Sequence, residues 1–378
     1  MTDLPSDKRS IEIMVAEIET IPTVIADQTT RLRAPFRALA EELGRPTPEV
    51  VLTGCGDSHF AGIGVKLAME RDAGVRCQAI EALELTRYAV RYIPTEPRPP
   101  LLVAISYSGS VGRTIEAAST AHRFGWRTVA LTGRREGRLA QAVDPILMDV
   151  PTLGFSPGTS TYVAMLTALY TLGAELATAA GRDRGAARTN AALEAAPELA
   201  RETIRVATGP AQKAAELIAA AGTSTFIGSG PHRASAEFGA AKLFEGPQRY
   251  GVAQQLEEWA HEQYFVSGPT TPIVVVAPSG AARDRAGELL EEMAFIGAPT
   301  ILVSDVVDDE VARSATVILP VAGGLDEAYS PLLTCLPLAL TAFFLAEHLG
   351  TQSYGFPSNE HEIEHYQTIH RDTRGEPA

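Results

Sequence analysis

Three serines stand where an apolar stretch of the chain gives way to a helix-like pattern. The segment AISYSGSVGRTIEAA, residues 104–118, places Ser106, Ser108 and Ser110 around a glycine at this junction. Short hydroxyl side chains and a glycine leave backbone N–H groups accessible, and the first turn of a helix carries a partial positive charge. The segment is therefore a candidate binding site for an anion, above all phosphate. The alternative is a polar loop in which a serine caps the following helix.

Composition and charge restrict the partners of this chain. Its 378 residues are 45% hydrophobic and 21% charged, which is typical of a globular protein of two domains. The formal net charge is −14, and there are four lysines, namely Lys8, Lys66, Lys213 and Lys242. This balance argues against nucleic acid as a partner, because binding to the phosphate backbone needs a basic surface. A pocket for one small anion remains compatible with it.

The cysteines and the apolar runs indicate a cytoplasmic protein. Cys55, Cys77 and Cys335 have no CxxC spacing, so we expect neither a disulfide framework nor a zinc site. The first twenty residues are polar and acidic, without the apolar core of a signal peptide. The longest apolar run, residues 332–350, contains Pro337 and is short for a bilayer, which predicts a buried helix. We expect no association with a membrane.

The chain contains an internal repeat. Four segments of the first half recur in the second half, in the same order and offset by 171 to 174 residues. The four pairs are residues 50–59 and 224–233, 101–109 and 272–280, 128–133 and 300–305, and 144–151 and 315–322. We infer that the chain holds two copies of one α/β unit.

Each copy alternates short runs rich in Val, Ile and Leu with amphipathic stretches of helical period. Three helical stretches cover residues 61–74, 114–125 and 282–297, and the last two end in glycine, a helix stop. Apolar strands separated by helices predict a parallel sheet covered on both faces. Ligands bind at the carboxyl ends of the strands in such sheets, where the turn at residues 54–58 and the loop at 106–110 lie.

We expect five segments along the chain. They are a helical segment over residues 1–34, a first α/β domain over 35–180, a linker or helix over 181–204, a second α/β domain over 205–346 and a tail over 347–378. The linker is predicted from the small, polar and charged residues that follow residue 178.

The nucleotide-binding motifs are incomplete. Gly54 and Gly56 form a Gly-x-Gly after a strand, but the third glycine of the dinucleotide fingerprint is missing. No acidic residue is clearly placed at the end of the next strand, and no lysine follows a glycine as a Walker sequence requires. We expect no nucleotide cofactor.

The segments GCGDSHFAG and ISYSGSVGRT, together with the repeat, resemble the sugar-isomerase (SIS) family, whose domains bind phosphosugars. More closely, roughly residues 35–360 resemble the double-SIS isomerase half of glucosamine-6-phosphate synthase and the related fructosamine-6-phosphate deglycases. The resemblance implies an α/β fold of two tandem SIS domains. Each would be a parallel sheet flanked by helices in a flavodoxin-like or Rossmann-like three-layer sandwich.

The resemblance implies a phosphate site in the first copy. The family's loop Ser-Gln-Ser-Gly-Glu-Thr is matched by residues 106–111, which retains Ser106, Ser108 and Gly109. Val111 stands in place of the threonine. Further binding residues implied by the resemblance are Thr114 as a substitute for that threonine, Ser58 from the family's Cys-Gly-Thr-Ser, and Ser160 and Thr161 from its Ser-Thr-Lys, whose lysine is a tyrosine here.

The resemblance places catalytic residues in the second copy. Residues 239–245 resemble the family's Gly-Ala-Leu-Lys-Leu-Lys-Glu, whose final glutamate moves a proton between C1 and C2 of an open-chain sugar, which assigns Glu245. Sixteen residues on, residues 258–261 match Glu-Leu-Lys-His, which assigns ring opening to His261. The family's following Gly-Pro is replaced by glutamate and glutamine. Lys242 and Glu258 are implied contacts to substrate hydroxyls.

The tail departs from the synthases. They form a Schiff base with a lysine in a Pro-Arg-Asn-Leu-Ala-Lys segment, where this chain has Glu362 and no lysine after Lys242. The repeated unit also begins within the first fifty residues, so we expect no glutaminase domain. The sequence HEIEH at residues 361–365 matches a zinc protease pattern. Without a protease scaffold around it, we expect no metal, and we expect the tail to pack over the sugar site with His361 near the substrate.

These departures lead to one expected function and two alternatives. We expect a deglycase or deaminase of a 6-phosphorylated amino sugar or fructosamine, with aldose–ketose isomerase chemistry, no cofactor and a phosphorylated sugar as partner. The alternatives are a non-catalytic protein that senses a sugar phosphate, and an ammonia-dependent synthase-like isomerase without its glutaminase domain. Because the family's histidine often comes from a neighbouring subunit, the resemblance implies at least a homodimer with a composite site.

Overall fold

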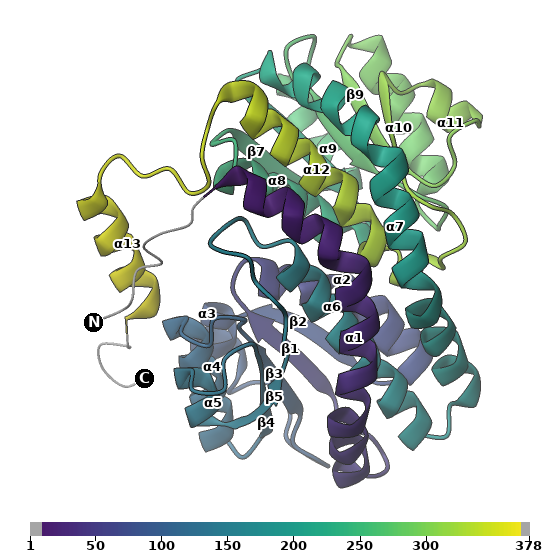
Figure 1. The fold of residues 1–378 in the computed structure, drawn as a ribbon. Helices are drawn as coiled ribbons and strands as arrows, with labels where there is room; N and C mark the ends of the chain where they lie inside the picture. Colours follow the sequence, from purple (N-terminus) through teal and green to yellow (C-terminus); the bar gives the residue numbers. More distant parts are fainter. Residues whose placement is uncertain (1–9, 372–378) are drawn as a thin grey trace. The chain divides into compact units, whose positions relative to one another are not determined.

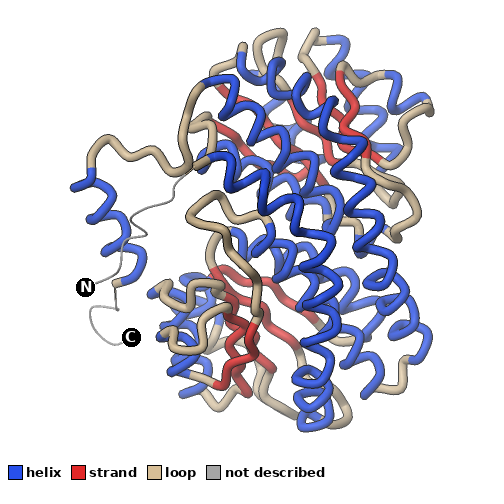
Figure 2. The backbone as a smooth tube through the Cα atoms, in the orientation of Figure 1, coloured by secondary structure: helices blue, strands red, loops and turns tan. Residues whose placement is uncertain are grey.

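Two parallel sheets of five strands each organise the computed structural model, which describes residues 10–371. Each sheet belongs to one compact unit of the chain. The first-repeat unit comprises residues 24–151, 161–193 and 356–371, and the second-repeat unit comprises residues 10–23, 152–160 and 194–355. Helices surround the strands of each sheet (Figures 1 and 2).

The first sheet has the strand order β2-β1-β3-β4-β5, and all neighbours are parallel. Its strands are β1 (Val50–Gly54), β2 (Cys77–Glu81), β3 (Leu101–Ile105), β4 (Arg127–Thr132) and β5 (Asp144–Leu147). Strands β1 and β3 are buried along their whole length, which explains their continuous apolar sequence.

The second sheet repeats this topology. Its strands are β6 (Thr223–Gly228), β7 (Tyr250–Gln255), β8 (Ile273–Val276), β9 (Thr300–Ser304) and β10 (Val317–Pro320), in the order β10-β9-β8-β6-β7. Read from the other edge, this is the order of the first sheet, strand for strand. The two α/β units predicted from the repeat are therefore confirmed, with the strand order of flavodoxin-like folds.

Helices accompany the strands in both units. In the first-repeat unit they are α2 (Asp57–Ala68) with the π-helical turn η1 (Met69–Ala73), α3 (Ala82–Glu84) with the π-helical turn η2 (Leu85–Ala89), α4 (Gly112–Arg123), α5 (Arg138–Ala142) and the tail helix α13 (Asn359–His370). In the second-repeat unit they are α8 (His232–Glu245), α9 (Leu256–His261), η3 (Gln263–Val266), α10 (Arg283–Phe295), α11 (Glu310–Arg313), η4 (Glu327–Tyr329) and α12 (Pro331–Leu349). Helices α1 (Ile11–Leu43), α6 (Ser160–Ala179) and α7 (Asp183–Ala219) have residues in both units.

The helical stretches predicted from periodicity correspond to α2, α4 and α10. The two glycine stops predicted from the sequence, Gly125 and Gly297, adopt φ values of 79° and 73°. That left-handed conformation suits glycine and ends a helix. Helix α1 continues through the predicted boundary at residue 34, and helix α7 continues through the one at residue 204. The domain boundaries themselves stay a prediction.

Helices α6 and α12 are long and apolar enough to cross a membrane by length and composition alone. However, 89% and 78% of their apolar windows are buried inside the protein. Core helices pass the same test of length and composition. The buried helix predicted over residues 332–350 is thus observed as α12.

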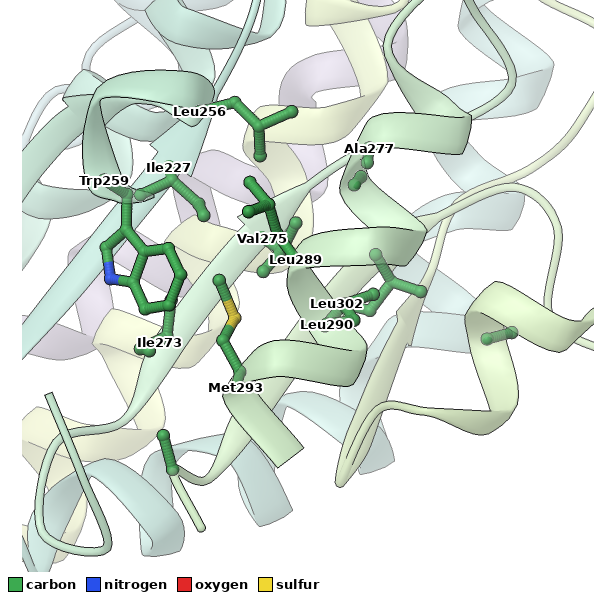
Figure 3. Close-up of a cluster of buried hydrophobic side chains, with 13 residues drawn as sticks. Ile227, Leu256, Trp259, Ile273, Val275, Ala277, Leu289, Leu290, Met293 and Leu302 are labelled. Carbon is green, nitrogen blue, oxygen red and sulfur yellow. The ribbon is translucent and has the colours of Figure 1, made fainter. Parts of the chain in front are cut away.

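The core of the second-repeat unit positions the segment that follows β7 (Figure 3). Trp259 of α9 is fully buried and packs with Ile273 and Val275 of β8 and Met293 of α10. Burying a tryptophan and its aliphatic neighbours stabilises the unit by several kcal/mol, on the order of 2 kcal/mol per large side chain. Helix α9 is consequently anchored although it has only six residues.

One buried histidine makes stability depend on pH. His232 opens α8, and its Nε2 lies 2.7 Å from Ser330 Oγ. Burial lowers the pKa of His232 to about 4 from its ordinary 6.5. The folded state therefore favours neutral imidazole, whereas the unfolded chain binds a proton below pH 6.5. Stability from this group is present above pH 6.5 and is lost as the pH falls toward 4.

We expect the free energy of unfolding to fall by about 2 kcal/mol between pH 7 and pH 5 because of His232 alone. Urea denaturation of the wild type and of His232→Gln at both pH values isolates this contribution, since every other titrating group is shared. The same fall in both proteins would contradict the assignment.

Candidate functional site

The serine loop, residues 106–111, connects β3 to α4 at the carboxyl edge of the first sheet. Ser106 is only 3% exposed; its amide donates to the Leu131 carbonyl at 3.0 Å. Within residues 10–371, its buried Oγ has no hydrogen-bond partner. Ser108 is exposed, and its Oγ accepts from Ser110 Oγ at 3.0 Å. The loop thus offers hydroxyls beside the first turn of a helix, a suitable environment for an anion.

Gly109 fixes the shape of this loop. Its φ is 63°, and a Cβ there would lie 3.0 Å from Thr132 Oγ1 and 3.4 Å from the Gly137 Cα. Its carbonyl accepts from the Leu139 amide at 2.9 Å, which ties the loop to α5. A side chain at this position would strain the backbone and displace its neighbours.

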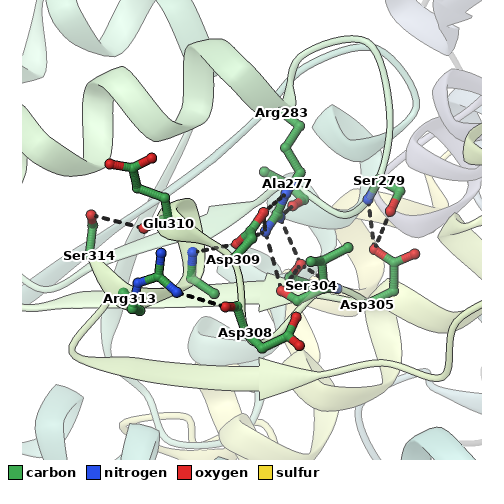
Figure 4. Close-up of polar contacts among 12 residues, drawn as sticks. Ala277, Ser279, Arg283, Ser304, Asp305, Asp308, Asp309, Glu310, Arg313 and Ser314 are labelled. Carbon is green, nitrogen blue, oxygen red and sulfur yellow. Dashed lines mark hydrogen bonds and ion pairs between the residues drawn. The ribbon is translucent and has the colours of Figure 1, made fainter.

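The equivalent loop of the second repeat is a closed loop, because carboxylates accept its hydrogen bonds; the contact of Ser279 with Asp305 is drawn in Figure 4. Ser279, the counterpart of Ser108, donates from its amide and its Oγ to Asp305 Oδ1, at 2.7 and 3.1 Å. The neighbouring Ala281 amide donates to Glu327 Oε2 at 3.0 Å. In the first repeat, Gly133 stands at the position of Asp305 and brings no carboxylate. Carboxylates of the chain itself therefore occupy the loop of the second repeat, and the loop of the first repeat stays the predicted anion site.

A partly buried arginine, Arg283, supports the closed loop. The Arg283 guanidinium donates to Asp309 at 2.8 Å and to Ser304 Oγ at 2.7 Å (Figure 4). The ion pair with Arg283 holds the pKa of Asp309 below its usual range, against the raising effect of its own desolvation. This cluster shapes the end of β9, and none of its residues is among the binding residues predicted from the sequence.

Ser58 and Thr114 lie in the first turns of the helices that follow the neighbouring strands β1 and β3. Ser58, in the first turn of α2, directs its Oγ to Met165 Sδ at 3.5 Å. Thr114 is fully buried, and its Oγ1 lies 3.9 Å from Cys55 Sγ. Burial and the neighbouring Glu81 carboxylate raise the pKa of the Cys55 thiol to about 12. Cys55 is therefore unsuited to act as a nucleophile.

Ser160 and Thr161 open helix α6, and both are buried. The Ser160 Oγ makes no hydrogen bond in the described part of the chain. Their roles in substrate binding stay predictions.

The tail helix α13 approaches the serine loop within the first-repeat unit. Arg138 Nη1 donates to the His370 carbonyl at 2.7 Å, and Arg113 Nη2 donates to the Arg371 carbonyl at 3.2 Å. His361 instead pairs through Nδ1 with Ser358 Oγ at 2.8 Å. No cluster of three metal-ligating side chains is found anywhere in residues 10–371.

Lys242 and Glu245 form a pair at the end of α8. The Lys242 side chain is fully buried, and its Nζ lies 2.6 Å from Glu245 Oε2. The ammonium also lies 4.9 Å from the centre of the Phe238 ring, a cation–π contact. A buried ammonium needs an anionic partner, so Lys242 holds the glutamate carboxylate at this place. Glu245 remains 25% exposed and can still be reached by a ligand.

Tyr354 joins the same carboxylate and was not predicted from the sequence. Its Oη lies 3.3 Å from Glu245 Oε2. It follows α12 in the chain, and no motif at this position indicates a site residue. Lys242 pairs with this same carboxylate, and its predicted contact with substrate hydroxyls stays a prediction.

His261 ends the short helix α9 and is 67% exposed. Its Nε2 lies 3.4 Å from Glu257 Oε1, and Glu257 in turn pairs with Arg285 at 2.6 Å. The hydrogen bond from Arg285 lowers the pKa of the Glu257 carboxyl. Gln255 caps α9 by accepting from the Glu257 and Glu258 amides, and Glu258 itself is exposed.

Glu245 and His261 lie near opposite ends of the strands in the second sheet. Helix α8 leaves the carboxyl end of β6 and returns antiparallel to it, so Glu245 lies near the start of β7. His261 follows the far end of β7. The six residues of this strand span about 16–20 Å, which separates the two side chains within one chain. The structure does not bring them together.

Serine substitutions test the difference between the two loops. We expect Ser106→Ala and Ser108→Ala each to weaken binding of fructose 6-phosphate about 10-fold to 100-fold, because each removes a hydrogen bond to a charged group. Ser279→Ala, the matched control in the closed loop, should leave the affinity unchanged in isothermal titration. Equal losses in all three variants would contradict a phosphate site confined to the first repeat.

Comparisons with known proteins bear on this geometry. No protein-family model matches the chain. A glutamine–fructose-6-phosphate aminotransferase (isomerizing) of Mycobacterium tuberculosis is 28% identical over 351 residues, covering 89% of this chain and 55% of that protein. The chain thus spans about half the length of the curated relatives it matches.

Two solved structures share the fold. The C-terminal domain of glucosamine-fructose-6-phosphate aminotransferase from Francisella tularensis superposes with a TM-score of 0.79 at 22% identity, covering 90% of this chain and 97% of that one. Glucosamine-6-phosphate deaminase from Thermotoga maritima gives a TM-score of 0.62 at 20% identity, covering 87% and 94%. The predicted two-sheet α/β fold and the resemblance to the isomerase half of the synthase are confirmed.

Proposed function

We propose that this protein is an enzyme that processes a phosphorylated sugar through an enediol or enediolamine. Its double SIS fold and its resemblance to the isomerase half of the aminotransferases support this. The substrate class is a 6-phosphorylated amino sugar or fructosamine, cleaved by a deaminase or deglycase reaction. The observation that carries the proposal is the Glu245 carboxylate, held by a buried ammonium at the exposed end of α8. We place the enzyme in the cytoplasm.

The serine loop supplies the binding energy in this proposal. The hydroxyls of Ser106 and Ser108 and the first turn of α4 would hold the phosphate, as helix N-termini hold anions. Phosphate binding fixes one end of an open-chain sugar, so that C1 and C2 can be presented to one base. The sugar hydroxyls are proposed to be contacted by Ser58, Ser160 and Thr161. Thr114, which is buried in the first turn of α4, is proposed to support the loop.

Glu245 is proposed to move one proton between neighbouring carbons. With a 2-amino sugar, the carboxylate removes the proton from C2 and returns it to C1, which leaves an imine at C2. With a fructosamine, the proton moves from C1 to C2 and leaves an imine at C1. Water then adds to the imine carbon, and the carbon–nitrogen bond breaks to release ammonia or an amine and a hexose 6-phosphate.

His261 is proposed to open the sugar ring in a site of a second copy of the chain. His261 follows the carboxyl end of β7, whereas Glu245 precedes the start of that strand, and this placement supports the arrangement. The exposure of the imidazole leaves it available to a neighbour. We therefore propose a homodimer with composite sites.

A tail Schiff base is not part of the proposal. The chain has no lysine after Lys242, and Glu362 stands where the synthases have theirs. A primary amine is required to form an imine with a sugar ketone. This favours cleavage or isomerisation over glutamine-dependent synthesis.

Proton exchange with solvent tests the proposal. We expect deuterium from heavy water to appear at C1 or C2 of fructose 6-phosphate, glucosamine 6-phosphate or a fructosamine 6-phosphate, followed by NMR. Glu245→Gln should lower the rate at least about 100-fold, the effect of losing a general base, while Glu291→Gln, an exposed glutamate of α10, should leave it unchanged.

Release of ammonia or amine from one substrate would identify the reaction. Binding of these compounds without any exchange would contradict an enzyme and favour a sugar-phosphate sensor instead.

A further inference from the structure

Two donors from distant parts of the chain meet one oxygen of Glu245. Lys242 Nζ lies 2.6 Å from Oε2, and Tyr354 Oη lies 3.3 Å from the same atom. The lysine is three residues away on the same helix, whereas the tyrosine is 109 residues further along the chain. A phenol O–H that donates to a carboxylate stabilises the anion without adding a charge.

Tyr354 adopts a backbone conformation that other interactions must hold. Its φ is 52°, in the left-handed region that costs a residue with a side chain about 1–2 kcal/mol. Its amide donates to the Glu245 carbonyl at 2.7 Å, so that backbone and side chain both engage the same glutamate. Gln248 Nε2 donates to the Gln352 carbonyl at 2.9 Å. This bond ties the segment before Tyr354 to the turn that follows α8.

The ring of Tyr354 is held from its other side. Phe155 stacks on it with a centroid distance of 4.7 Å and an interplanar angle of 28°. The segment that carries Phe155 is anchored by Glu17 of α1, which accepts from the Leu153 amide at 3.1 Å and from Ser156 Oγ at 3.3 Å. Aromatic stacking of this kind contributes beyond simple burial and restricts ring rotation.

We propose that Tyr354 is a positioning residue for the proton transfer by Glu245. The stacked ring fixes where the phenol points, and the phenol together with Lys242 fixes the carboxylate rotamer and keeps it ionised. The inference rests on the proposed function for its consequence in catalysis. Its structural content, a phenol that stabilises the Glu245 anion, stands apart from that function.

Tyr354→Phe tests the role with little change of shape, because the ring and its stacking on Phe155 remain. We expect kcat for exchange or turnover to fall about 5-fold to 30-fold with KM nearly unchanged, since the phenol touches the base. The acidic limb of the kcat–pH profile should move up by as much as about 1 pH unit. Tyr250→Phe, an exposed tyrosine of β7, is the matched control and should show neither change.

A second readout does not require activity. In protein labelled with carbon-13 at the glutamate carboxyl, the Glu245 resonance is assigned by its loss in Glu245→Gln. Its titration should move to higher pH in Tyr354→Phe and not in Tyr250→Phe. Phe155→Leu, which keeps the phenol but loosens the ring, should show a smaller change in the same direction.

The outcomes separate the two proposals. An unchanged titration and an unchanged kcat–pH profile in Tyr354→Phe, with Glu245→Gln inactive, would overturn the inference alone. A shifted titration with full activity in Glu245→Gln would support the contact and overturn the proposed function. Thermal unfolding of each variant is the control that tests whether a change in activity or titration comes from loss of the fold.

Discussion

Parallel strand pairing is the constraint on which the rest of this structure depends. Two parallel strands can be joined only by a crossover that returns along the sheet, so each connecting helix starts at the carboxyl edge and ends at the amino edge. The serine loop follows β3 and therefore lies at a carboxyl edge, beside the positive end of α4. Glu245 ends α8 and therefore lies at an amino edge, while His261 follows β7 and lies at the opposite one.

Duplication gave two equivalent loops, and a few side chains made them different. Both loops follow the third strand of their repeat and precede a helix. In the second repeat, Asp305 and Glu327 accept the hydrogen bonds that a bound anion would otherwise take. In the first repeat, Gly133 stands at the position of Asp305, and the buried Ser106 Oγ has no hydrogen-bond partner within residues 10–371. These two carboxylates distinguish the second-repeat loop from the first-repeat loop, which we propose as the phosphate site.

The sequence allowed prediction of whatever depends on local pattern. Equal spacing between repeated segments predicted two equivalent sheets, and Gly125 and Gly297 marked helix ends through their conformational freedom. Glu245 and Lys242 were assigned from the resemblance to a family motif, and their ion pair follows from the helix, because residues three apart share one face. Tyr354 and Phe155 were missed, since they reach Glu245 or each other only through tertiary packing across long sequence separations.

The separation of Glu245 from His261 could not be predicted from their spacing of sixteen residues either. The segment between them contains the whole of strand β7. This separation underlies our proposal that one active site uses Glu245 of one chain and His261 of another. Co-expression of Glu245→Gln and His261→Ala chains tests it most directly. Random pairing in a two-fold dimer should restore about a quarter of the wild-type exchange rate. Mixed dimers no more active than the separate variants would contradict the shared site.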